Sequence, residues 1–107
     1  MTRVELLIQS WDLPADPQAM DAYRKKAREE WIPTVLRQPG LKDFRGYRNA
    51  LRMSPHAMIH TEWEDLVSLT TWVRSDDYAR IFEELRAFGC TNLTTQMWTT
   101  SSLFEDD

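Results

Sequence analysis

The feature that most constrains the fold of this chain is the succession of two spacing patterns of apolar residues along the sequence. Some segments alternate apolar and polar residues with the period of a strand, and others have the three- and four-residue spacing of an amphipathic helix. The predicted strands cover residues 3–11, 41–51, 57–63 and 92–102. The predicted helices cover residues 17–38, 66–73 and 78–88, the last two forming one split helical region. The expected order of elements is therefore β-α-β-β-α-β.

Prolines and glycines mark the boundaries of these elements. Asp16 precedes a proline and can cap the first helix with its carboxylate. Pro33 is expected to kink or interrupt the last turns of this helix, because it removes a backbone hydrogen bond. Gly40 and Gly89 end the first and last helices, since glycine tolerates the left-handed conformation found there. Gly46, inside the second strand, predicts a bulge or the close approach of another backbone or a ligand.

This order predicts a ferredoxin-like α+β fold, a four-stranded antiparallel sheet with the helices on one face, because both split crossovers are right-handed. The other face is left bare, and one residue of register shift would exchange the two sets of side chains. The candidates for this face are Leu7, Trp11, Tyr47, Trp63 and Trp98. Burying each large side chain is worth about 1.5–3 kcal/mol. We therefore expect a second copy to cover the face in a homodimer, which closes a dimeric α+β barrel.

Composition limits the classes of function. With 42% apolar and 28% charged residues among 107, we expect one domain at residues 1–104 and a short acidic tail at residues 105–107. A net charge of −4 with dispersed Lys and Arg argues against a nucleic-acid partner. No run approaches the roughly 20 apolar residues of a membrane helix, and we find no signal-peptide pattern at the start. Cys90 is the only cysteine, which excludes an internal disulfide and indicates a reducing, cytoplasmic location.

Three polar residues on or near the predicted strands are candidate catalytic groups. Histidine side chains titrate near neutral pH, which makes His60 the candidate acid or base, with simple structural hydrogen bonding as the alternative. Asn49 and Gln9 can hold a carbonyl or phenolate group, or bond across the sheet or the dimer. His56, His60 and Glu62 share one side of a regular strand, as metal ligands can, but no further convergent ligand is identifiable. We therefore expect no metal site.

Aromatic residues on the predicted helices and strands are candidates for the wall of a ligand pocket between these layers. Flat rings would suit an aromatic substrate, and the alternative is that the same rings simply fill the core. The residues concerned are Trp63, Trp72, Trp31, Tyr23, Tyr78 and Phe82. Cys90 has no evident activating partner, so we do not expect it to act as a nucleophile.

Short motifs spread over nearly the whole chain carry a resemblance to a known group. They are Pro-Gly-Leu at residues 39–41, Thr-Glu-Trp-Glu-Asp at 61–65, Trp-Val-Arg-Ser at 72–75, and the last strand through Trp98. In these features the chain resembles the dimeric α+β barrel superfamily, and within it the antibiotic biosynthesis monooxygenase-like domains. The motifs are short and degenerate, so they indicate the fold more strongly than the reaction.

The resemblance implies a monooxygenase without a bound cofactor that acts on a small aromatic or polyketide-type compound. On this hypothesis His60 is the base, Asn49 or Gln9 stabilises the substrate anion, and Trp63 and Trp72 are the walls of the pocket. The alternative is a non-catalytic dimeric protein that binds a small hydrophobic ligand. Heme binding or degradation is the third possibility, and it lacks its axial histidine because Phe82 occupies that position.

Overall fold

The computed structural model describes residues 3–104 of the chain. Its strands and helices, in chain order, are β1 (Glu5–Asp12), α1 (Pro17–Lys26), the π-helical turn η1 (Ala27–Trp31), α2 (Ile32–Leu36), β2 (Leu41–Arg48), β3 (Ala57–Trp63), α3 (Leu66–Val73), α4 (Asp76–Ala87), β4 (Thr91–Thr99) and the short 3-10 helix η2 (Ser102–Phe104). The expected acidic tail at residues 105–107 lies outside the described residues. The predicted order of elements is confirmed.

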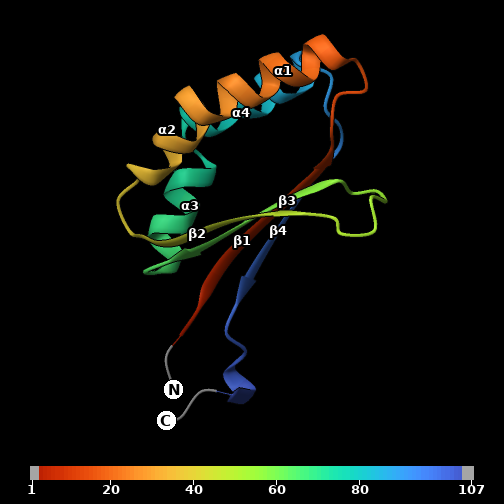
Figure 1. Ribbon diagram of the computed structural model, residues 1–107. Helices are drawn as coiled ribbons and strands as arrows, with labels where there is room; N and C mark the ends of the chain where they lie inside the picture. Colours follow the sequence, from red (N-terminus) through yellow and green to blue (C-terminus); the bar gives the residue numbers. More distant parts are fainter. Residues whose placement is uncertain (1–2, 105–107) are drawn as a thin grey trace.

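The four strands form one antiparallel sheet in the order β2-β3-β1-β4. All the longer helices lie on one side of this sheet, and the other side carries none of them (Figure 1). The ferredoxin-like α+β fold is therefore confirmed. Pairing of two sheets into a barrel stays a prediction.

Strand pairing determines which side chains lie under the helices. Leu7, Trp11 and Trp63 face the helices and are almost completely buried, so their assignment to the bare face is wrong. Side chains alternate along a strand, and the actual register places the neighbouring residues of β1 and β3 outward instead. Tyr47 and Trp98 do lie on the open face, with exposed fractions of 46% and 56%.

The first helical region is interrupted just before Pro33, as its sequence predicts. Proline has no N–H, and its ring clashes with the carbonyl four residues earlier in a regular α-helix. The chain widens into the π-helical turn η1, in which the Ile32 N–H bonds the Ala27 carbonyl five residues back. At the start of α1 the Asp16 carboxylate accepts a hydrogen bond from the Ala19 N–H at 2.9 Å. The region ends at Leu36, two residues earlier than expected.

The turns fit the expected roles of their glycines with one difference. Gly40 and Gly89 have φ values of +85° and +100°, the left-handed conformation predicted for helix ends. Gly46 pairs regularly with Ile59, whereas the irregularity in β2 falls between Leu41 and Asp43. Gly46 therefore marks an open place on the helix-facing side of β2 and no bulge. Within the described residues, no helix is long and apolar enough to cross a membrane.

Candidate functional site

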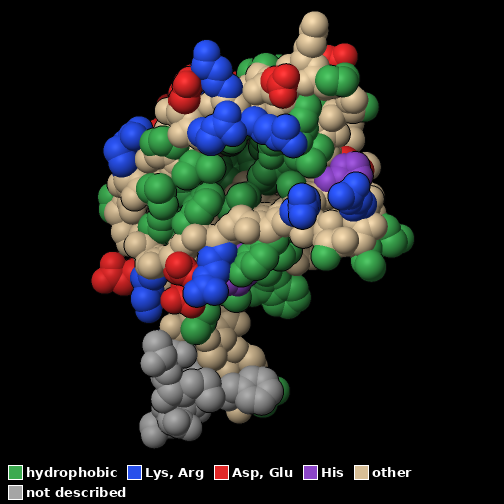
Figure 2. All heavy atoms as spheres, in the orientation of Figure 1, with side chains coloured by type: hydrophobic (Ala, Val, Ile, Leu, Met, Phe, Trp, Pro, Cys, Tyr) green, Lys and Arg blue, Asp and Glu red, His purple; other side chains and the backbone are tan. Residues whose placement is uncertain are grey.

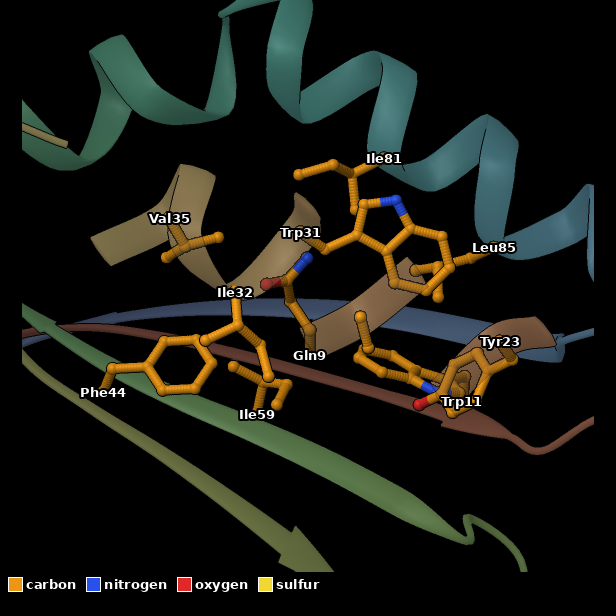
Figure 3. Close-up of a pocket in the computed structure, with 11 residues that line it drawn as sticks. Gln9, Trp11, Tyr23, Trp31, Ile32, Val35, Phe44, Ile59, Ile81 and Leu85 are labelled. Carbon is orange, nitrogen blue, oxygen red and sulfur yellow. The ribbon is translucent and has the colours of Figure 1, made fainter. Parts of the chain in front are cut away.

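A cavity of about 120 Å³ lies between the helical layer and the sheet. Side chains from both layers point into it, with Phe44 and Ile59 rising from the sheet toward Ile32 (Figure 3). The lining residues are Gln9, Trp11, Tyr23, Ala27, Trp31, Ile32, Val35, Phe44, Ile59, Ile81 and Leu85. Ten of these eleven side chains are hydrocarbon or aromatic, so the cavity favours an apolar ligand.

Two small residues keep this space open. Ala27 lies in the cavity-facing row of the first helical region, between the larger Tyr23 and Trp31. Gly46 presents no side chain between Phe44 and Arg48 on the helix-facing side of β2. Figure 2 shows the result as a hollow lined by hydrophobic side chains, with Lys and Arg gathered around its rim. The cavity is therefore reached from solvent beside β2.

Polar groups are few in the cavity, and each has a defined role. The Trp11 indole N–H donates to the Tyr23 hydroxyl oxygen at 3.0 Å. Burial raises the pKa of Tyr23 above its usual value, so the hydroxyl stays protonated at neutral pH. It can therefore donate its own hydrogen, while its oxygen holds Trp11 in place. The Gln9 amide points from the sheet toward Trp31 (Figure 3).

Gln9 also interacts with a second tyrosine outside the cavity. Burial raises the pKa of Tyr78, although hydrogen bonds with Thr95 and Gln9 act in the opposite direction. The Tyr78 and Thr95 hydroxyl oxygens are 3.1 Å apart. Tyr78 of α4 and Thr95 of β4 are therefore polar neighbours of the Gln9 amide on the helix-facing side of the sheet.

An ion-pair network fixes the Trp31 ring from the side of α4. The Trp31 indole N–H donates to Glu84 at 3.1 Å, and Glu84 also pairs with Lys26 and Arg80 at 3.2 and 2.8 Å. Burial acts to raise the pKa of Glu84, but the indole and the two cations outweigh it and the pKa is lowered. Glu84 therefore remains ionised at neutral pH, and Trp31 forms a rigid wall.

The predicted aromatic residues divide into two groups. Tyr23 and Trp31 line the cavity and contact each other, with ring centroids 5.7 Å apart. The other four are absent from its lining and form a continuous row of ring contacts beside it. The row runs from Trp63 through Trp72 and Tyr78 to Phe82, with centroid distances of 6.4, 5.7 and 4.9 Å. This row fills the core, as the alternative interpretation of these rings expects.

The three candidate catalytic residues do not come together. Gln9 lines the cavity. His60 follows Ile59, which faces the cavity, so the imidazole lies on the opposite, open face of the sheet. Its Nδ1 is buried and has no hydrogen-bond partner among the described residues. Asn49 lies in the turn after β2, where its amide donates to the Pro55 carbonyl and its oxygen accepts from the Leu51 N–H.

The two histidines are held in different surroundings. His56 precedes β3, and its Nδ1 accepts a hydrogen bond from the Leu13 N–H at 3.0 Å. Within residues 3–104, no three His, Cys, Asp or Glu side chains converge as metal ligands do. The considered set of His56, His60 and Glu62 therefore does not form a cluster.

The sequence does not identify several of the residues that line the cavity. Ile32, Val35, Phe44 and Ile59 look like ordinary core residues, because an apolar side chain beside a cavity has the same pattern as one in solid packing. One signal was present in β2, where the small Gly46 follows two residues after the large Phe44 on one face. That combination indicates missing volume at the edge of the sheet.

Comparison with solved structures confirms the expected resemblance at the level of the fold. A candidate antibiotic biosynthesis monooxygenase of Deinococcus radiodurans has a TM-score of 0.70 and 11% identity, covering 99% of each chain. A dabb family protein with a ferredoxin-like fold from Mesorhizobium loti has a TM-score of 0.68 and 12% identity, covering 94% of this chain and 100% of its own. An ethyl tert-butyl ether d (ethd) family protein of Bacillus halodurans has a TM-score of 0.61 and 22% identity, covering 89% and 97%. No protein-family model and no curated protein matches the sequence.

Proposed function

We propose that this protein binds a small, mainly apolar ring compound in the cavity between its helices and its sheet. The observation that carries the proposal is the cavity itself, a space lined by ten hydrocarbon or aromatic side chains and one amide, Gln9. A protein that used this fold only as a scaffold would gain stability by filling the space, since empty apolar volume costs about 24 cal/mol per Å³.

The size of the cavity limits the ligand. An apolar cavity of about 150 Å³ is known to hold one benzene molecule. The 120 Å³ available here therefore accepts a single ring, with any substituent extending through the opening beside β2. A compound of several fused rings, of the polyketide type, exceeds this space. We accordingly narrow the ligand class to single-ring compounds.

Filling the cavity tests the proposal. Ala27→Leu adds a branched side chain at a lining position, and we expect it to weaken the binding of phenol at least tenfold while the chain stays folded. Titration followed by tryptophan fluorescence measures this, because Trp11 and Trp31 line the cavity. Ala22→Leu is the matched control, since Ala22 is an exposed residue of α1, in the same helical region. Equal binding of phenol by both variants, or no binding by the unmodified chain, would overturn the proposal.

A reaction with oxygen is the second candidate, and the name of the Deinococcus radiodurans neighbour, a candidate antibiotic biosynthesis monooxygenase, favours it. We propose for it an electron-rich phenol that reacts as its anion, with the Gln9 amide donating a hydrogen bond to the developing charge. The substrate itself supplies the electrons, one oxygen atom enters the product and the other leaves as water. We do not assign His60 or Asn49 to this step, since neither lines the cavity.

A measurement of oxygen consumption distinguishes an oxygenase from a protein that only binds the ring compound. With a catechol as substrate, we expect consumption above the rate without protein, and we expect Gln9→Leu to lower that rate about 10- to 100-fold while ring binding persists. The leucine has nearly the same size but donates no hydrogen bond. If the unmodified chain binds the ring and consumes no oxygen, the protein is a binder and the oxygenase proposal is wrong.

We also propose that the open sheet face is covered by a second copy. Leu6 and Ile8 of β1, Met58 of β3, Tyr47 and Trp98 form an apolar surface there that the helices do not touch. A homodimer would bury this surface and enclose the shielded Nδ1 of His60.

We propose a cytoplasmic location, because Cys90 is the sole cysteine and forms no internal disulfide.

A further inference from the structure

Three arginines lie on the helical flank and the strand face that border the cavity, just outside its lining. Ile32 and Val35 face the cavity from one flank of the helical region, and Arg28 and Arg24 precede Ile32 on the same flank at four-residue spacing. Arg48 lies across the opening, because it shares the helix-facing side of β2 with Phe44. Figure 2 shows Lys and Arg side chains around the hollow.

These arginines have no acidic partner within 4.0 Å among the described residues, a property that they share with Lys25, Arg37, Arg52, Arg74 and Arg86. Lys26 pairs with Glu30 and Glu84 on the opposite flank of the helix, and Arg45 pairs with Asp43 on the open face of the sheet. Three cations without a carboxylate partner among the described residues therefore border one cavity in a chain whose net charge is −4.

The interior and the opening differ in the chemistry that they accept. The interior offers hydrocarbon walls and the neutral groups of Gln9 and Tyr23, and its lining includes no charged side chain. The planar guanidinium of arginine matches a carboxylate with two parallel hydrogen bonds. A ring held inside with its acidic group at the opening satisfies both regions at once.

We propose that the natural ligand is a ring compound with an anionic substituent, a small aromatic acid, whose ring occupies the cavity and whose carboxylate lies among Arg24, Arg28 and Arg48. This inference rests on the proposed binding function and adds the charge of the ligand to it. Gly46 leaves room for the substituent to pass between Phe44 and Arg48.

Benzoate and benzamide test the proposal, because they have nearly the same shape and differ in charge. We expect benzoate to bind about tenfold more tightly at low salt, and the preference to shrink as sodium chloride is raised toward 0.5 M. Arg28→Gln and Arg48→Gln are each expected to weaken benzoate binding about two- to fivefold, which is the usual range for one exposed ion pair. Neither variant should change the binding of benzamide.

Lys25→Gln is the matched control, because Lys25 is an exposed cation of the same helix on the side away from the cavity. It removes the same net charge and should leave benzoate binding unchanged. Equal affinities for benzoate and benzamide, or equal effects of Lys25→Gln and Arg28→Gln, would overturn the inference and leave ring binding intact. Failure of both compounds and of phenol to bind would instead overturn the proposed function.

Discussion

At the scale of single residues, Cys90 links burial to the pH dependence of stability. Burial raises the pKa of its thiol to about 11, compared with an ordinary value of 9.0. Below pH 9 the thiol is protonated in the folded and unfolded chain alike, so it adds no pH dependence. Between pH 9 and 11 it ionises only in the unfolded chain, and stability must fall as pH rises.

We expect this thiol to lower the free energy of unfolding by about 1–2 kcal/mol between pH 8 and pH 10.5, since a tenfold change in acidity corresponds to about 1.4 kcal/mol. Tyr23 and Tyr78 also have raised pKa values and act in the same direction. Urea denaturation of the unmodified chain and of Cys90→Ala at both pH values isolates the thiol. An equally steep decline in the two proteins would contradict the assignment.

Individual residues also mark the limit of what the sequence predicts about the site. The apolar spacing of the first helix predicts that Tyr23 and Trp31 point inward, and both line the cavity. Gln9 shares the helix-facing side of β1 with Trp11. His60 lies on the open face, because its neighbour in sequence, Ile59, faces the cavity. Which face a strand turns inward depends on its pairing with distant strands, and no local pattern encodes that pairing.

At the scale of secondary-structure elements, local physical chemistry predicts much more. The strand β3 has its predicted bounds, and both parts of the split second helical region form where their spacing places them. Pro33 predicts the interruption of the first helical region, but not its form as the π-helical turn η1. The cavity is the volume that elements of fixed shape leave unfilled.

The connection from α2 to β2 depends on one glycine packed against the start of α3. A Cβ atom at Gly40 would overlap the Ser68 side chain, and the φ of +85° is itself unfavourable for other residues. We expect Gly40→Ala to lower the free energy of unfolding by about 2 kcal/mol or more, of which 1–2 kcal/mol comes from the backbone conformation. Urea denaturation measures the loss.

Two further variants separate the causes of this effect. Ser68→Gly in the Gly40→Ala background removes the overlap and should recover only part of the stability. Gly46→Ala is the matched control, since its Cβ would meet Ile59 at an ordinary 3.5 Å, and we expect a change within about 0.5 kcal/mol. Full stability of the Gly40→Ala chain would show that the loop shifts without cost.

At the scale of the whole molecule, the uncovered sheet face predicts self-association. Trp98→Lys places a charge on this face at a side chain that is 56% exposed, so the monomer core is not disturbed. We expect the unmodified chain to sediment as a dimer at low micromolar concentration and Trp98→Lys to sediment as a monomer. Val67→Lys, at an exposed position on α3, serves as the control and should remain dimeric. A monomeric unmodified chain would remove the basis of the barrel.

The cavity and the uncovered face lie on opposite sides of a single sheet. If two chains meet through their uncovered faces, their cavities point away from each other, each with its own route to solvent. Occupancy of one would then leave the other unaltered, so saturation should follow a simple hyperbola with two equivalents per assembly and a Hill coefficient of about 1.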